Sequence, residues 1–272
     1  MFFSADNFAL TAAQAACVAL PGAGLPRWAQ RLRAPGWALT LPLSIAIVVA
    51  AIAVLPSTAD LLTWVALILV PPGCALALGW AARGARPWAA ALAAPLLAIA
   101  WALPDDRVGQ AATTVLIAGS AVTLGRLLAG AAPLQLLKAG VVAMAAVDAF
   151  LVFSNNLQEP NAVLVAASPG PGLPQLQSAS FGDAGLGYGD FFAAAVVGGI
   201  LAAERRYQLA AAVATVAVSL VWDQLFLVYD VLPATVPPAV VLMAVEVWGR
   251  DRARRGVSRP RRPRPGPSRS RP

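Results

Sequence analysis

Runs of mostly apolar residues follow one another along almost the whole chain, and each is close to the ~20 residues that a helix needs to cross a bilayer. Lipid offers no hydrogen-bond partners, so a crossing segment must satisfy its own backbone groups, which a single run does as a helix. Only 12% of the 272 residues are charged, whereas an ordinary soluble domain has about 25%. The sequence therefore predicts an all-α, polytopic transmembrane helix bundle, a multi-pass protein of the plasma membrane.

About nine spans are expected. The first, 8–25, is weak because Gln14 and Pro21 interrupt it, so the bundle has nine helices if this segment crosses and eight if it does not. The other candidate spans are 37–55, 61–80, 87–103, 111–132, 136–153, 187–203, 209–228 and 233–248. We expect residues 1–135 to hold spans one to five, residues 136–248 to hold spans six to nine with a long loop at 154–186, and residues 249–272 to form a tail.

Basic and acidic residues fall in alternate loops. One set of loops, together with the tail, contains Arg27, Arg31, Arg33, Arg83, Arg86, Arg126, Lys138, Arg205 and Arg206. The other set contains Asp60, Asp105, Asp106, Glu159, Asp183 and Asp230, and of the 20 basic residues only Arg107 falls there. Because positive residues stay on the cytoplasmic side, this pattern predicts a cytoplasmic C-terminus and places the 154–186 loop outside.

The tail, 249–272, is rich in arginine and proline and is expected to be disordered. Its charge favours contact with anionic lipid at the membrane surface, and nucleic acid is not an expected partner because no aromatic residues interleave the arginines. The chain has no histidine, and its two cysteines, Cys17 and Cys74, lie in apolar surroundings. No metal site, disulfide or cofactor is therefore predicted.

Two acids interrupt the apolar runs. Asp148 lies within LLKAGVVAMAAVDAFLVF, 136–153, and Asp190 ends GLGYGD, 185–190, as the next run begins. A charged side chain in the hydrocarbon layer costs roughly 2.5–3.5 kcal/mol or more, so such an acid marks a candidate functional site. The span limits place both acids about one helical turn, ~5–8 Å, below the outer surface. Neighbouring antiparallel helices would then bring the two carboxyl groups together.

A close pair of carboxyl groups shares one proton, because both cannot ionise cheaply. This is the state that an aspartyl protease uses to activate water, and Asp190, at a helix N-terminus, is the better candidate for the charged partner. We expect Gly185, Gly187 and Gly189 to adopt positive φ or to let a substrate backbone approach closely. A simple helix-entry loop with small residues for packing is the alternative.

A third element, DVLPATVPPAVVL at 230–242, precedes the last span. Pro233, Pro237 and Pro238 interrupt regular helical hydrogen bonding. The freed backbone groups could pair with a substrate held as an extended strand. Alternatively these prolines mark an ordinary helix N-terminus, where proline is common.

Taken together, Asp148, GYGD at 187–190 and PAT at 233–235 resemble the presenilin and signal peptide peptidase family in their order and in the helices that carry them. The resemblance covers roughly residues 136–248. It implies a nine-span, GxGD-type intramembrane aspartyl protease that cleaves transmembrane proteins or signal peptides without a cofactor. The site residues that it implies are catalytic Asp148 and Asp190, with Gly187, Tyr188, Gly189, Pro233, Ala234 and Thr235 binding the substrate.

Two positions depart from the family pattern, and three other functions remain open. Val147 stands where the family has Tyr, and Thr235 stands where it has the Leu of PAL.

Prepilin peptidases also contain GxGD, but they place a further span between their acids and act at the cytoplasmic face. A proton or ion transporter could use Asp148, Asp190 and Asp223, although Asp223 is better explained by structural pairing with Gln224, Tyr229 or a neighbouring helix. A catalytically inactive scaffold that binds membrane helices is also conceivable. The small residues at 193–199 predict close helix packing.

Overall fold

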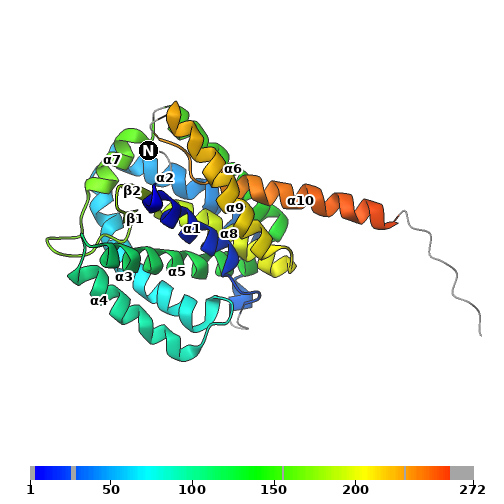
Figure 1. The fold of residues 1–272 in the computed structure, drawn as a ribbon, viewed down its shortest axis with the longest axis horizontal. Helices are drawn as coiled ribbons and strands as arrows, with labels where there is room; N and C mark the ends of the chain where they lie inside the picture. Colours follow the sequence, from blue (N-terminus) through cyan, green and yellow to red (C-terminus); the bar gives the residue numbers. More distant parts are fainter. Residues whose placement is uncertain (1–3, 26–28, 155, 230, 258–272) are drawn as a thin grey trace, which may run out of the picture.

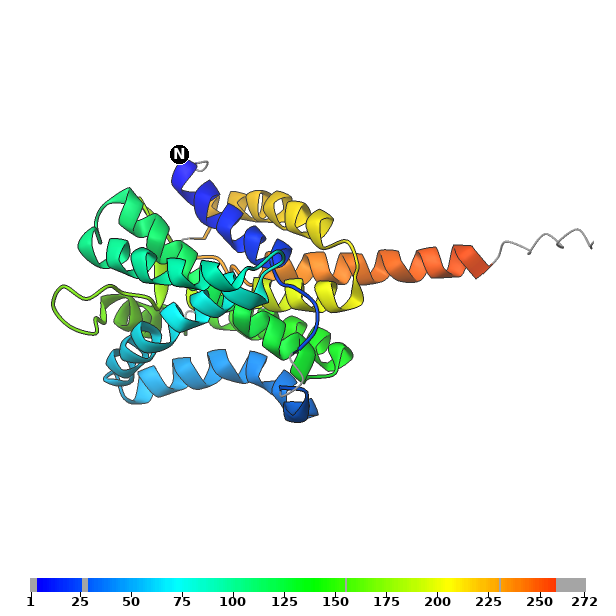
Figure 2. The ribbon, with the colours of Figure 1, turned by 90° about the horizontal axis from the view of Figure 1, so that it is seen from below.

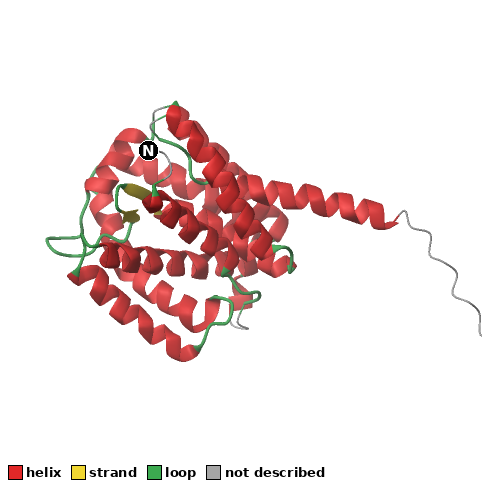
Figure 3. Ribbon diagram, viewed as in Figure 1, coloured by secondary structure: helices red, strands yellow, loops and turns green. Residues whose placement is uncertain are grey.

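The computed structural model describes residues 4–25, 29–154, 156–229 and 231–257, which form ten α-helices and one two-stranded hairpin (Figures 1 and 3). The helices are α1 (Ala5–Ala19), α2 (Thr40–Val54), α3 (Thr58–Leu76), α4 (Ala93–Ala102), α5 (Arg107–Ala131), α6 (Leu134–Phe153), α7 (Gln158–Ala166), α8 (Tyr188–Glu204), α9 (Gln208–Trp222) and α10 (Val236–Val257). The strands are β1 (Ser178–Phe181) and β2 (Ala184–Gly187). The predicted all-α class is confirmed.

Five helical segments are long and apolar enough to cross a membrane, so the chain has the structure of an integral membrane protein. They are Pro35–Val54, Thr58–Ala81, Arg107–Ala131, Leu134–Phe153 and Gln208–Leu227. Two shorter apolar helical segments, Pro87–Ala102 and Val236–Gly249, coincide with two more predicted spans. The remaining two predictions, 8–25 and 187–203, fall on α1 and α8, which have 15 and 17 residues. At 1.5 Å per residue these two helices are ~22 and ~26 Å long, shorter than a ~30 Å hydrocarbon core.

Helix α8 lies at the centre of the bundle. Its middle is apolar on every side, so neighbouring helices can pack against all of its faces. Its residues from Ala193 to Ala202 are buried between α1 and α5. A Cβ atom built on Gly198 would lie 2.5 Å from the carbonyl oxygen of Val18, and one on Gly199 would lie 2.5 Å from that of Gly125. The small residues at 193–199 therefore permit the close helix packing that the sequence predicts.

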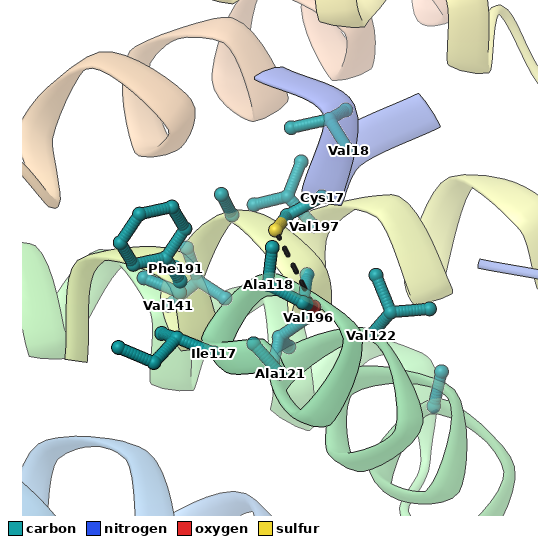
Figure 4. Packing of buried hydrophobic residues seen from close by; sticks show 14 of the residues in the cluster. Cys17, Val18, Ile117, Ala118, Ala121, Val122, Val141, Phe191, Val196 and Val197 are labelled. Carbon is teal, nitrogen blue, oxygen red and sulfur yellow. Dashed lines mark hydrogen bonds between the residues drawn. The ribbon is translucent and has the colours of Figure 1, made fainter. Parts of the chain in front are cut away.

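Figure 4 shows the packing around this central helix. The Cys17 thiol of α1 donates a 3.7 Å hydrogen bond to the carbonyl oxygen of Ala118 in α5. Phe191, the residue after Asp190, is completely buried in the same cluster as Val141 of α6. The start of α8 is thus fixed against α6.

The outer surface carries large apolar side chains, as expected of helices in lipid. Ile47 and Val54 of α2, Ile68 of α3, and Val213 and Val221 of α9 are each 60% exposed or more. Figure 2 shows α1 and α9 on one side of the bundle and α2 on the other. Such exposure would be unfavourable in water but costs nothing against acyl chains.

The polar segment between α6 and α8 does not cross the membrane. Its helix α7 has nine residues and is only ~13 Å long at 1.5 Å per residue. The hairpin that follows pairs Ser178 with Gly187 and Phe181 with Ala184, and Gly182 has a φ of 56° in the two-residue turn. The sequence analysis did not predict this hairpin, because two four-residue strands of mostly small residues carry little strand pattern.

Helix α10 extends farther than expected. Residues 249–257, predicted as the start of a disordered tail, belong to this helix, which projects from the bundle in Figures 1 and 2. Arginine and alanine are good helix formers, so the helix continues beyond its apolar part. The rest of the predicted tail, 258–272, lies outside the described residues.

Candidate active site

Asp148 and Asp190 lie on the neighbouring helices α6 and α8. Asp148 lies near the end of α6 and is 7% exposed. Asp190 lies in the first turn of α8 and is partly exposed. The two helices are in contact, and hydrogen bonds link both acids to the segment before α10: Thr235 donates to Asp148, and Gln14 donates to the carbonyl oxygens of Ala234 and Asp190. The structure therefore brings the two predicted acids together across neighbouring helices.

The backbone at the beginning of α8 holds the Asp190 carboxylate. The N–H of Gly187 donates a 3.1 Å hydrogen bond to Oδ2 of Asp190. Gly187 is the N-cap of the helix and has extended backbone angles, φ −73° and ψ 157°. An acid in this position caps the helix and lies at the positive end of its dipole.

Thr235 binds the other acid. Its hydroxyl donates a 2.6 Å hydrogen bond to Oδ2 of Asp148, and the residue is only 1% exposed. Helix α10 begins at Val236, so Pro237 and Pro238 lie in its first turn. Backbone N–H groups in the first turn have no intrahelical acceptor, so proline, which lacks an N–H, loses no hydrogen bond there. These two prolines thus have the ordinary helix-start role, and PAT at 233–235 forms the turn that presents Thr235 to Asp148.

Gln14 of α1 links the second and third motifs, and the sequence analysis missed this role. Its Nε2 donates a 2.8 Å hydrogen bond to the carbonyl oxygen of Ala234 and a 3.3 Å hydrogen bond to that of Asp190. The Gln14 side chain is 3% exposed. A polar residue inside an apolar run was the available signal, but it was interpreted only as an interruption of the first span.

The motif glycines do not use left-handed backbone angles. None of Gly185, Gly187 and Gly189 has a positive φ, so of the two roles considered for these glycines only close backbone approach remains. The strand β2 and the helix start keep this backbone in ordinary extended and helical conformations. A Cβ atom built on Gly185 or Gly189 would meet no heavy atom within 4 Å. The backbone at these two positions is therefore open to close approach.

Tyr188 is anchored away from the acids. Its hydroxyl and the Ser120 hydroxyl of α5 form a 2.9 Å hydrogen bond, and its N–H donates to the carbonyl oxygen of Gln177 at 3.1 Å. The predicted substrate-binding residue therefore also fixes the junction of β2 and α8 to α5.

Asp223 has a partner on a neighbouring helix, one of the structural explanations expected from the sequence. The side-chain amide of Asn7 in α1 donates a 2.7 Å hydrogen bond to Oδ2 of Asp223. Gln224, the other partner considered, instead donates to the carbonyl oxygen of Leu220.

Within residues 4–25, 29–154, 156–229 and 231–257, no three Asp, Glu or Cys side chains gather as metal ligands would. The site consists of two acids, a hydroxyl donor and an amide that joins their supporting segments. No protein-family model matches the chain, and neither a curated protein nor a solved structure matches it.

Proposed function

We propose that this protein is an intramembrane aspartic endopeptidase that hydrolyses peptide bonds of transmembrane or signal-peptide segments. The observation that carries the proposal is that Asp148 and Asp190 lie on the contacting helices α6 and α8, each with its own hydrogen-bond donor. The order of Asp148, GYGD and PAT, which resembles presenilins and signal peptide peptidases, agrees with it.

The two acids have different surroundings, and this asymmetry assigns their roles. Asp190 accepts the Gly187 N–H at a helix N-terminus, where the dipole favours a negative charge, so we assign it as the ionised partner. Asp148 is buried and accepts the Thr235 hydroxyl on one oxygen, so its other oxygen holds the shared proton.

Hydrolysis then follows from proton transfer between water, the acids and the peptide. Asp190 removes a proton from water as the water oxygen attacks the peptide carbonyl carbon. Asp148 gives its proton to the carbonyl oxygen, which forms a gem-diol. The proton that Asp190 received passes to the peptide nitrogen, the C–N bond breaks, and a diol proton returns to Asp148.

An extended substrate can approach the acids along the backbone that precedes α8. Strand β2 leads directly into GYGD and keeps one edge unpaired within the described sheet. Apart from the Gly187 N–H, which Asp190 accepts, the outward N–H and C=O groups of this edge can pair with a further strand. The open space beside Gly185 and Gly189 leaves room for that strand's backbone.

The proposed membrane arrangement has nine spans, with α1 and α8 as short crossings inside the bundle. The positive-inside pattern places the basic loops and the C-terminus in the cytoplasm and the acids toward the outside. A prepilin peptidase needs a further span between its acids, and the nine residues of α7 are too few for one.

The test is cleavage by the full chain in proteoliposomes that contain a tagged single-span peptide. Asp148→Asn and Asp190→Asn keep the size of each side chain and should each abolish cleavage. Asp223→Asn is the matched control, because its oxygen can still accept from Asn7, and should cleave at the wild-type rate. A hydroxyl-containing mimic of the gem-diol should inhibit the wild type.

Retained cleavage in either dyad variant would refute the assignment. Substrate capture without cleavage by the wild type would identify a scaffold. Proton flux that disappears in Asp223→Asn, without any proteolysis, would identify a transporter.

A further inference from the structure

A cavity of about 710 Å³ lies at the end of the bundle opposite the dyad. Gly199, Ala203 and Arg205 of the α8 end line it. These positions are ~13–22 Å from Asp190 along the helix axis, at 1.5 Å per residue. The other walls come from residues 22–25 and 33–35 and from the α5–α6 junction. The cavity is therefore separate from the proposed catalytic site.

Among the residues that the structure describes, three arginines line this cavity and no acidic residue does. They are Arg33, Arg126 and Arg205, and within the described chain none of them forms an ion pair with a carboxylate. Glu204, the acid next to Arg205, instead pairs with Lys138. The cavity thus has an uncompensated positive charge, which favours an anion.

Hydrogen bonds within the protein hold one of these arginines in place. Arg126 donates to the carbonyl oxygens of Ala23 and Gly24, at 3.2 and 3.0 Å, and to that of Trp80. Its guanidinium also lies 3.9 Å from the centroid of the Trp80 ring. A positive group fixed in this way needs little rearrangement when a ligand arrives.

A second arginine is anchored at one nitrogen only. Nε of Arg33 donates a 3.0 Å hydrogen bond to the carbonyl oxygen of Gly130. Its two Nη groups make no hydrogen bond within the described residues and remain available to an anion. The planar guanidinium suits two oxygens of a phosphate group at once.

The rest of the lining is apolar, including Leu25, Pro35, Ala129 and Leu134. A basic group beside an apolar wall fits a molecule with a phosphate and hydrocarbon chains better than it fits a free inorganic ion. The arginines also come from loops that the charge pattern assigns to the cytoplasmic side, where anionic lipids are concentrated.

We propose that this cavity binds the phosphate group of an anionic phospholipid, with Arg33, Arg126 and Arg205 as its ligands and the apolar wall against the start of an acyl chain. The proposal does not depend on the protease activity, since it uses none of the dyad residues.

The test measures binding of phosphatidylglycerol and phosphatidylcholine to the full-length protein in detergent, by native mass spectrometry and by the shift in Tm. The wild type should bind phosphatidylglycerol preferentially. The double variant Arg33→Gln/Arg205→Gln should lose affinity by about tenfold or more, the effect of ~1.4 kcal/mol. Arg126 is left unchanged, because its hydrogen bonds to carbonyl groups also support the fold.

The matched control is Arg31→Gln/Arg86→Gln, which removes the same charge from exposed positions outside the cavity. It should keep wild-type affinity, and an equal loss in this control would overturn the proposal in favour of general surface attraction. Ala203→Leu narrows the cavity without changing its charge and should also weaken binding. If inorganic phosphate or glycerol phosphate stabilises the protein as strongly as phosphatidylglycerol, the ligand is a soluble phosphate and the lipid assignment is wrong.

Discussion

The Thr235 hydroxyl donates a 2.6 Å hydrogen bond to Oδ2 of Asp148, although 87 residues separate the two in the sequence. The bond joins the C-terminal part of α6 to the turn that precedes α10. It satisfies one oxygen of a buried acid and leaves the other for a proton. Thr235 stands where presenilins and signal peptide peptidases have the Leu of PAL, and it makes a hydrogen bond that Leu could not make, because Leu has no donor.

Replacing Thr235 with Val should remove this donor while keeping the shape of the side chain. We expect a loss of about tenfold or more in kcat, since ~1.4 kcal/mol of transition-state stabilisation corresponds to tenfold, and a loss of ~1–3 kcal/mol in stability from the unsatisfied acid. Thr235→Ser keeps the hydroxyl and should retain most of the activity. Rates of peptide cleavage in proteoliposomes provide the measurement. Equal activity of the Val and wild-type proteins would exclude a role for the hydrogen bond.

Gln14→Leu should separate the two motifs that this side chain joins. Its Nε2 donates to the carbonyl oxygens of Ala234 and Asp190, at 2.8 and 3.3 Å, so the variant leaves both carbonyls without this donor. We expect a stability loss of ~1–3 kcal/mol. We also expect kcat to fall with little change in KM, because the variant disturbs the alignment of the two acids but removes no contact with the substrate. Single-turnover cleavage and thermal unfolding measure the two effects.

Gln208 offers a matched control for this prediction. It is also a buried glutamine, and its Nε2 donates to the carbonyl oxygens of Val18 and Pro21, at 3.0 and 2.9 Å, far from the dyad. Gln208→Leu should therefore reduce stability by a similar amount while kcat stays unchanged. A parallel fall in kcat in both variants would show that Gln14 acts only through general stability.

The sequence was informative about local features and uninformative about distant ones. The apolar runs located every described helix except α7, which lies in the predicted loop 154–186; Asp148 is buried, and the small residues near Gly198 pack closely as predicted. The link from Gln14 to Asp190 and Ala234 spans 176 and 220 residues and depends on how α1 packs against α8 and α10. No spacing rule within one helix can reveal such a contact.

The ion pairs of Lys138 are a second example of long-range contacts that the sequence did not predict. The sequence analysis places Lys138 among the basic residues of the loops on the cytoplasmic side. In the structure Lys138 is 8% exposed and forms ion pairs with both Glu204 and Glu246. A charge buried among helices needs partners of opposite sign, but only the three-dimensional packing shows which acids provide them. The cluster joins α6, α8 and α10, the three helices whose other ends position Asp148, Asp190 and Thr235.

Lys138→Met should destabilise the bundle strongly, because it leaves Glu204 and Glu246 close together without their shared cation. Removing one partner of a buried ion pair costs about 3–5 kcal/mol. The triple variant Lys138→Met/Glu204→Gln/Glu246→Gln removes all three charges and should recover much of the loss. Thermal unfolding in detergent provides the measurement. If Lys138→Met were as stable as the wild type, the ion pairs of Lys138 would not contribute to the stability of the bundle.

Two glycines of α8 should respond to alanine in opposite ways. At Gly198 the added Cβ would lie 2.5 Å from the Val18 carbonyl oxygen, so α1 must move, and overpacking of this kind costs ~1–3 kcal/mol. At Gly189 the added Cβ meets nothing within 4 Å, and alanine favours a helix over glycine by about 0.8–1 kcal/mol, so the fold should be as stable or more stable. Cleavage by Gly189→Ala should nevertheless fall, because the methyl group occupies the space through which a substrate backbone reaches Asp190. Unfolding temperature and kcat/KM, measured on both variants, separate the glycine that serves packing from the glycine that serves access. Full activity in Gly189→Ala would mean that the substrate reaches the acids from another side.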